Sequence, residues 1–335
     1  MANTAELDAT DKKVLQALSE NARASLSVIA KKARCSKQVA AYRISNLLKK
    51  GIISQFITIF NWQMLGYTSF RLYIRLANIK PAEQVKMIET LKSFRGVYFI
   101  GACEGKVDLL VRFLAKNPSE FQEIFDEFIG RFGSFILDKE VTIVTRDPFM
   151  ATSPGRYLYG GEQINLERRK TTQTAKAISL GSLDWKIMAA IADSPRASFA
   201  DLASTCGASP DVVAYRIKKL ISNEIILNFK PILDTKKLGY EHHQVFLKLQ
   251  NAKPSELDPF FRFYNTHQYV VFLMGCIGSW DVEIGFDARN IQHFHEQVLE
   301  LKDKFGAIIK EYDTAVFFEQ FYPNAVRNVF TGRRQ

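Results

Sequence analysis

Apolar residues recur at a spacing of three to four between Ser36 and Gly51, which is typical of an α-helix with one buried face. The expected buried face consists of four side chains: Val39, Ile44, Leu47 and Leu48. The opposite face carries longer polar side chains: Lys37, Gln38, Tyr42 and Arg43. Ser36 suits the N-cap of such a helix, and Gly51 suits its left-handed C-terminal stop. The pattern predicts a helix that packs on a small core and presents a basic face.

The same pattern returns between Ser209 and Glu224, where the letters Ala-Tyr-Arg-Ile of residues 41–44 reappear at residues 214–217. Adding 173 to a residue number in the first half gives its counterpart in the second, with no gap from roughly residue 11 to residue 144. A register kept over that length indicates a duplicated unit. Two copies of a long period are typical of a domain duplication and not of a solenoid.

Each copy begins with a three-helix pattern. Residues 11–20 predict the first helix, and Ser25 or Ser27 caps a short second helix. A tight turn leads into the third helix, and residues 52–60 then alternate strongly enough to predict a β-ribbon, the wing. Three short helices followed by a wing indicate a winged helix-turn-helix.

The remainder of each copy predicts the element order βαββαβ, which is ferredoxin-like. In the first copy the ranges are 70–76, 81–94, 97–102, 107–114, 118–132 and 137–145. In the second copy they are 245–249, 254–264, 270–276, 282–286, 291–305 and 308–318. The fold class is therefore α+β, with two winged helix-turn-helix domains alternating with two ferredoxin-like domains. The expected division is 1–64, 65–150, a linker at 151–182, 183–238 and 239–335, with residues 156–159 echoed at residues 327–330.

The amino-acid composition limits the class of binding partner that we expect. The formal net charge of +10 favours an acidic partner such as nucleic acid. The four cysteines form no Cys-x-x-Cys pair, so we expect small apolar side chains in a reducing compartment. The start of the chain has no signal-peptide core and no run of about 18 apolar residues occurs, so we expect a cytoplasmic protein without a membrane segment.

The motifs together resemble the Lrp/AsnC transcription regulators. Ser36, the Tyr42-Arg43-Ile44 triplet and Gly51-Ile52-Ile53 are similar to that family's recognition helix, and residues 105–108 (Gly-Lys-Val-Asp) resemble its RAM-domain hairpin. Residues 278–281 (Gly-Ser-Trp-Asp) match the hairpin signature better, because Val107 departs at the aromatic position. The resemblance implies a transcription regulator built as two fused units, an intramolecular pseudo-dimer with a possible amino-acid effector. It also implies further homo-oligomers.

The candidate residues for contact with double-stranded DNA lie on the two recognition helices. They are Ser36, Lys37, Gln38, Tyr42, Arg43, Lys49, Ser209, Tyr215, Arg216 and Lys218. Arginine can bind guanine and glutamine can bind adenine in the major groove. The structural alternative is a solvated basic face, or a tyrosine–arginine pair that packs against a neighbouring helix.

The two helices are unequal in charge. Residues 11–67 hold ten Lys or Arg against two acids, a balance of +8, whereas residues 184–240 hold eight against six, a balance of +2. Pro210 and Asp211 replace Lys37 and Gln38, and an aspartate repels phosphate. We therefore expect the first helix-turn-helix to dominate DNA affinity.

Candidate effector-binding residues are Gly105, Asp108, Gly278 and Asp281, with a tight structural turn as the alternative. Trp280 is expected to be a packed interface residue. All five histidines fall in the second half without the spacing of a zinc site, so we expect solvated or capping histidines, no metal and no cofactor. The alternative functions are a fused siroheme-decarboxylase-like enzyme and an effector-sensing scaffold that has lost DNA binding. The first would need basic and histidine residues around a tetrapyrrole cavity.

Overall fold

The computed structural model describes residues 5–77, 79–146, 156–159, 178–250 and 252–330. Each copy opens with three helices, which we call a head. The first head contains α1 (Ala9–Glu20), α2 (Leu26–Ala33) and α3 (Lys37–Lys49). The second contains α6 (Ser182–Asp193), α7 (Phe199–Cys206) and α8 (Pro210–Ser222). Serine side chains accept a backbone N–H at the start of the second and third helices, as the sequence predicts: Ser25, Ser36, Ser198 and Ser209.

The buried face of α3 differs from the expected one. Ile44 and Leu47 are buried, but Val39 and Leu48 are 39% and 41% exposed. Ala40 is fully buried in their place, because residues 40, 44 and 47 lie at the i, i+4 and i+7 positions of one helix face. The expectation that Val39 and Leu48 face the core is therefore wrong, and a small alanine lets the helix approach its neighbours closely.

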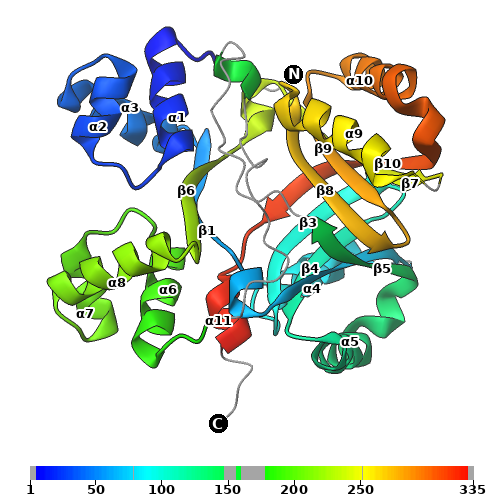
Figure 1. Cartoon of the computed structure of the whole chain (residues 1–335), viewed down its shortest axis with the longest axis horizontal. Coiled ribbons are helices and arrows are strands. Elements are labelled where there is room, and N and C mark those ends of the chain that lie inside the picture. The colour runs from blue at the N-terminus through cyan, green and yellow to red at the C-terminus, as the bar shows by residue number, and fades with distance from the viewer. Residues whose placement is uncertain (1–4, 78, 147–155, 160–177, 251, 331–335) are drawn as a thin grey trace.

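The wing is shared between the copies. Strand β1 (Ile53–Phe60) pairs antiparallel with β6 (Ile226–Leu233), and these two strands form a separate two-stranded ribbon. The expectation of a ribbon within each copy is wrong, because eight residues without an internal turn supply only one strand. The ribbon runs between the two heads, so the backbone of each copy hydrogen-bonds to the other (Figure 1).

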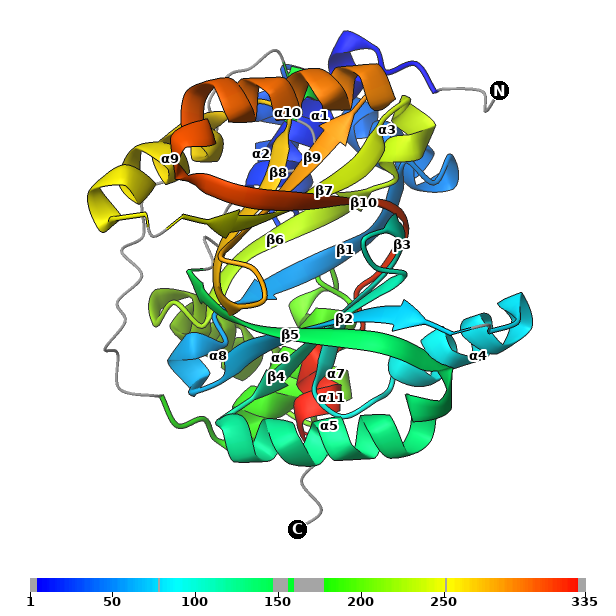
Figure 2. The same cartoon turned by 90° about the vertical axis from the view of Figure 1, so that its right-hand side faces the viewer.

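The two ferredoxin-like units join into one closed eight-stranded barrel (Figure 2). The first unit contains β2 (Thr68–Leu76), α4 (Pro81–Leu91), β3 (Val97–Gly105), β4 (Leu109–Ala115), α5 (Pro118–Phe132) and β5 (Ile136–Arg146). The second contains β7 (Glu241–Leu249), α9 (Pro254–Thr266), β8 (Val270–Gly278), β9 (Val282–Ala288), α10 (Ile291–Phe305) and β10 (Ile309–Phe321). The strand order within each unit, β5-β2-β4-β3 and β10-β7-β9-β8, confirms the ferredoxin-like prediction. Antiparallel pairing of β5 with β8 and of β10 with β3 closes the barrel.

Side chains alternate between the two faces of each barrel strand. On β2, Phe70, Leu72 and Ile74 pack outward against the helices α4 and α5, where they share a core with α5 residues such as Phe128. The intervening side chains face the barrel interior, whose apolar part includes Tyr73, Phe99, Leu110, Phe246, Trp280 and Phe317. Closure therefore buries both faces of a strand that the sequence pattern alone would leave half exposed.

The segment after each unit docks on the other unit. The amide of Asn328, on α11 (Ala325–Phe330), donates to the Lys92 and Val97 carbonyls of the first unit at 3.0 and 2.7 Å. The hydroxyl of Tyr157 donates to Asp287 of the second unit at 2.8 Å. Helix α11 also packs against α6, and the turn Arg156–Tyr159 packs against α1. The expected linker falls largely on residues 160–177, which lie outside the described residues.

Candidate functional site

The residues expected to touch DNA lie mostly on exposed helix surface. Lys37 and Gln38 are exposed in the first turn of α3, and Tyr42 is 66% exposed one turn later. Tyr215, at the same place on α8, is 63% exposed. The remaining exposed candidates are Ser36, Lys49, Ser209 and Lys218. These side chains can reach a ligand of the size of a duplex, and DNA contact stays a prediction for each.

Arg43 and Arg216 differ from the other candidates because both are engaged inside their own head. Arg43 Nη1 lies 2.6 Å from Asp8 Oδ2 and 3.3 Å from Asp11 Oδ1, at the start of α1. Arg216 Nη1 lies 3.4 Å from Asp184 Oδ2, at the start of α6. The repeated ion pair ties the recognition helix to the first helix, so the geometry favours the structural alternative for these two arginines.

The N-termini of the two recognition helices differ in chemistry. Helix α8 begins with Pro210 and Asp211, both exposed, where α3 presents Lys37 and Gln38. Asp211 stabilises the positive end of its own helix dipole but repels a phosphate backbone. The first turn of α3 is therefore the better match to DNA.

A pair of arginines that the sequence analysis left unassigned joins the two heads. Arg23 Nη1 donates to the Pro195 and Ala197 carbonyls of the second head at 2.7 and 2.8 Å. Its counterpart Arg196 donates to the Ala22 carbonyl of the first head. Burial lowers the pKa of both arginines, which nevertheless stay cationic. We call this reciprocal contact the arginine clasp.

The arginine clasp is reinforced by aromatic side chains. The Arg23 guanidinium lies 4.9 Å from the centre of the Phe199 ring, and that of Arg196 lies 5.4 Å from the centre of the Phe56 ring. The heads also share one continuous apolar core. The triplet Arg-Ala-Ser, which occurs at residues 23–25 and again at residues 196–198, is the signal in the sequence, although its role depends on a contact between copies. The two heads that carry the recognition helices are thus joined by polar contacts and by a common core.

The hairpin residues proposed for an effector have structural roles in the barrel. Gly105 and Gly278 have φ values of +126° and +137°, and a Cβ on either would lie 2.5 Å from a carbonyl oxygen of the facing strand. The Asp108 carboxylate accepts from the Leu76 N–H at 2.7 Å, and the Asp281 carboxylate accepts from the Leu249 N–H at 2.8 Å. These contacts favour the tight-turn alternative, and effector binding at the hairpins stays a prediction.

The histidines at the start of β7 differ from the expectation that they are solvated or capping. His242 and His243 are buried and not solvated, because β7 lies inside the closed barrel sheet. His242 Nδ1 lies 3.0 Å from Asp287 Oδ1, and His243 Nε2 lies 3.2 Å from Glu241 Oε2. His293 does cap, since its Nδ1 accepts from the Arg289 N–H at 3.2 Å. Within the described ranges, no three His, Cys, Asp or Glu residues gather as a metal site would require.

Comparison with known proteins places the chain in a class and then in a family. A family model described as winged helix-turn-helix DNA-binding matches residues 7–54 and again residues 181–226, so both heads are of that class. An uncharacterised HTH-type transcriptional regulator of Pyrococcus furiosus is 34% identical over 123 residues, which are 36% of this chain and 81% of the relative. A second from Pyrococcus horikoshii is 32% identical over 120 residues, 35% of this chain and 79% of the relative. The chain belongs to the HTH-type transcriptional regulators, and its two winged helix-turn-helix matches place two units in tandem.

The tandem arrangement also has a structural counterpart. The crystal structure of the siroheme decarboxylase NirDL covers 97% of this chain and 98% of its own length, with a TM-score of 0.62. The sequences are only 11% identical, so the similarity concerns the fold. Among the described residues, no helix is long and apolar enough to cross a membrane.

Proposed function

We propose that the chain regulates transcription by binding double-stranded DNA sequence-specifically, with its two fused units acting as an intramolecular pseudo-dimer. The observation that carries this proposal is the exposed first turn of α3, where Lys37 and Gln38 stand free of the protein core on a head of the winged helix-turn-helix class. The β1–β6 ribbon and the arginine clasp hold the second head beside it. One chain would thereby supply what a dimer of single-unit regulators supplies.

The two heads contribute unequally in this proposal. Base contacts of helix-turn-helix proteins fall on the N-terminal residues of the recognition helix, where Gln38 can pair with adenine and Lys37 can bind guanine or phosphate. The second head, which starts with Pro210 and Asp211, binds more weakly or contacts a different half-site. Half-sites one helical turn apart lie roughly 34 Å from each other. Lysine contacts to phosphate make the affinity fall steeply with salt.

Three further properties belong to the same proposal. An amino-acid effector modulates binding at the hairpins around Gly105 and Gly278, the fused units associate into larger homo-oligomers, and the protein acts in the cytoplasm. The family and its repeated hairpin support the first two, and the basic net charge supports a compartment that contains nucleic acid.

Selection from a random duplex library, followed by fluorescence anisotropy between 50 and 200 mM salt, tests the proposal. We expect the purified chain to enrich a defined motif and the Lys37→Ala/Gln38→Ala variant to bind it at least about tenfold more weakly. Lys310→Ala removes the same charge from exposed β10 and serves as the matched control. Failure to enrich any motif, or equal losses in the two variants, contradicts the proposal.

The enzyme alternative requires a cavity with a particular set of lining residues. A siroheme-decarboxylase-like enzyme is expected to line its tetrapyrrole cavity with basic and histidine residues. The cavity beside the ribbon is lined by Arg112 and Arg196, and its described lining includes no histidine. Incubation with siroheme followed by mass spectrometry tests this alternative directly, since loss of carbon dioxide from the tetrapyrrole would support it.

A further inference from the structure

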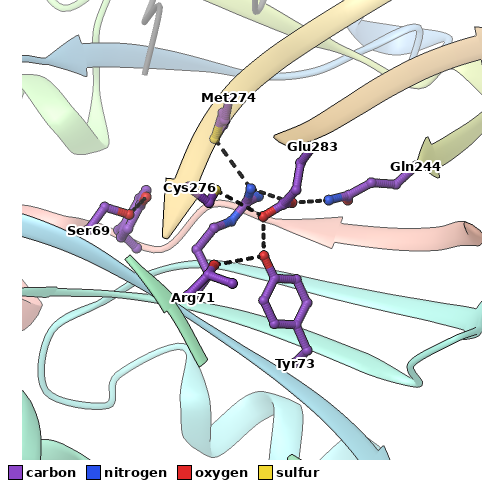
Figure 3. A network of polar contacts seen from close by, with 9 residues as sticks. Ser69, Arg71, Tyr73, Gln244, Met274, Cys276 and Glu283 are labelled. Atoms are coloured by element: carbon purple, nitrogen blue, oxygen red, sulfur yellow. Dashed lines mark hydrogen bonds and ion pairs between the residues drawn. The ribbon is translucent and has the colours of Figure 1, made fainter. Parts of the chain in front are cut away.

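The barrel interior holds a buried ion pair between the two units. Arg71 of β2 pairs with Glu283 of β9, and neither side chain is exposed to solvent. The Glu283 carboxylate also accepts hydrogen bonds from Tyr73 and Gln244, and the Cys276 thiol lies 3.5 Å away (Figure 3). Both oxygens of this carboxylate therefore have hydrogen-bond or ion-pair partners, and its single negative charge already pairs with Arg71.

A second arginine shares this interior without a carboxylate of its own. Arg112 of β4 is 9% exposed, and among the described residues it forms no ion pair and its Nε has no acceptor. Its guanidinium lies 4.1 Å from the centre of the Phe99 ring. Two atoms of Arg71, Nε and Nη2, also lack acceptors. Two buried cations thus face one anion, a costly arrangement unless another anion joins them.

Arg112 lines a cavity of about 690 Å³ between the barrel, the β1–β6 ribbon and the turn that follows α6. This volume lies in the range of small-molecule sites. The walls are largely aromatic: Phe56, Trp62, Tyr67, Tyr98, Phe99 and Tyr322. The other charged side chains in the lining are Asp193, which pairs with Arg327, and Arg196 of the arginine clasp. The Arg112 end therefore combines a positive charge with broad apolar walls.

A comparison of the two copies shows that these charged residues are not shared by both ferredoxin-like units. The counterpart of Arg112 in the second unit is Gly285, and the counterpart of Arg71 is Gln244. The surrounding framework is repeated, since Phe99 corresponds to Phe272. The ferredoxin-like unit therefore does not require a charged residue at this position, which leaves Arg112 open to a role in binding.

We propose that this cavity binds a carboxylate carried on a flat apolar body, with the carboxylate on the Arg112 guanidinium and the body against the aromatic walls. A planar guanidinium matches a carboxylate through two parallel hydrogen bonds, and the aromatic faces match a fused-ring hydrocarbon. The site is separate from the hairpins at Gly105 and Gly278. Because the ribbon and the turn after α6 line the cavity, its occupant contacts both the barrel and the heads. The inference that occupancy alters DNA affinity rests on the proposed function.

Isothermal titration calorimetry of the full chain with 2-naphthoate tests the site. We expect binding at millimolar or lower concentration, and at least tenfold weaker binding of 2-naphthamide, which has the same shape without the charge. Arg112→Gln should weaken naphthoate binding at least tenfold. Arg75→Gln, on an exposed position of the same strand β2 as Arg71, should leave it unchanged. The amide comparison uses the unaltered protein, so it holds even if Arg112→Gln folds poorly.

The outcomes separate this inference from the proposed function. No naphthoate binding, equal binding of acid and amide, or full binding by a folded Arg112→Gln variant overturns the cavity assignment whatever the DNA assay shows. Arg112-dependent binding in a chain that selects no duplex supports the cavity and contradicts the DNA proposal. If both activities occur, anisotropy with and without saturating naphthoate measures their coupling, and an unchanged affinity overturns only the regulatory link.

Discussion

In the heads, residues 173 positions apart make the same contact, as Arg23 and Arg196 do when each reaches carbonyls of the opposite head. In the barrel interior, the same shift joins unlike residues: Arg112 corresponds to Gly285, and Glu283 corresponds to Leu110. The contact between the heads thus retains a two-fold relation at the level of side chains. The polar residues of the barrel interior do not.

This difference shows at which positions the two copies must carry the same residue and at which positions they can diverge. A reciprocal contact such as the arginine clasp uses each residue once on either side, so both copies must keep the arginine. The barrel interior encloses one volume, to which either unit can contribute a charged residue. Divergence there produces a single off-centre polar cluster. Variants at corresponding positions can therefore test which parts of the chain are still equivalent.

Glu283→Gln should have the largest effect on stability. The substitution removes the only carboxylate that, among the described residues, faces the Arg71 and Arg112 guanidinium groups, and breaking a buried ion pair costs about 3–5 kcal/mol. Urea unfolding monitored by circular dichroism measures this loss. Glu311→Gln, on the exposed side of β10, is the charge-matched control.

The double variant Arg71→Gln/Glu283→Gln shows whether charge is the cause. The double variant leaves one buried cation, Arg112, where Glu283→Gln leaves two, so we expect it to lose less free energy of unfolding than Glu283→Gln alone. A double variant that is less stable than the single variant would show that packing, and not charge, dominates the effect.

Arg23→Ala and Arg196→Ala should destabilise the chain by similar amounts, about 1–3 kcal/mol each, because each leaves at least one carbonyl oxygen of the opposite head without a donor. Matched urea-unfolding midpoints measure the two losses. Midpoints that differ by more than the error of paired measurements would show that the arginine clasp is symmetric in geometry but not in energy.

Tyr42→Ala and Tyr215→Ala test the asymmetry of the recognition helices. The two tyrosines have nearly the same exposure, 66% and 63%, so neither substitution should change stability by more than about 0.5 kcal/mol. Loss of a DNA contact of about 1 kcal/mol would weaken binding roughly fivefold in Tyr42→Ala, with a smaller loss in Tyr215→Ala. Anisotropy on the selected duplex measures both, and a larger loss in Tyr215→Ala would reverse the proposed ranking of the heads.

The sequence alone predicts most of the local structure but few of the contacts between the two copies. The helix N-caps, the strand order of each unit and the exposed start of α3 follow from periodicity and capping residues that lie close together in the chain. The shared ribbon does not, because an eight-residue strand is compatible with any partner that has free backbone groups.

The buried polar residues around Arg71 and Glu283 do not follow from the sequence pattern, for a related reason. Arg71 alternates with Phe70 and Leu72, a pattern typical of a strand with one solvated face, and only closure by the second sheet makes that face an interior. Burial of an arginine is therefore a property of the assembled barrel. The difference between residues 112 and 285 was visible in the aligned copies, and it is the signal that could have marked the site.

The smallest expected effect concerns pH and again compares the two copies. His243 stacks on Phe294 with ring centres 4.2 Å apart, whereas the corresponding pair in the first unit, Phe70 and Phe121, has no titratable group. Burial lowers the pKa of His243 below its ordinary 6.5, and it outweighs the opposing effect of Glu241. Below about pH 6.5 the unfolded chain therefore binds a proton that the folded chain does not, and stability falls as the pH decreases, by at most about 1.4 kcal/mol per pH unit.

His243→Phe restores the residue of the first unit and should flatten the loss of stability between pH 7.5 and pH 5.5. The reverse substitution, Phe70→His, should steepen it, because Phe70 is 97% buried and a histidine there would also resist protonation. Urea unfolding of the three proteins at both pH values measures the differences. If the His243→Phe variant loses as much stability on acidification as the unaltered chain, the pH response arises elsewhere in the barrel, and this position does not distinguish the two units.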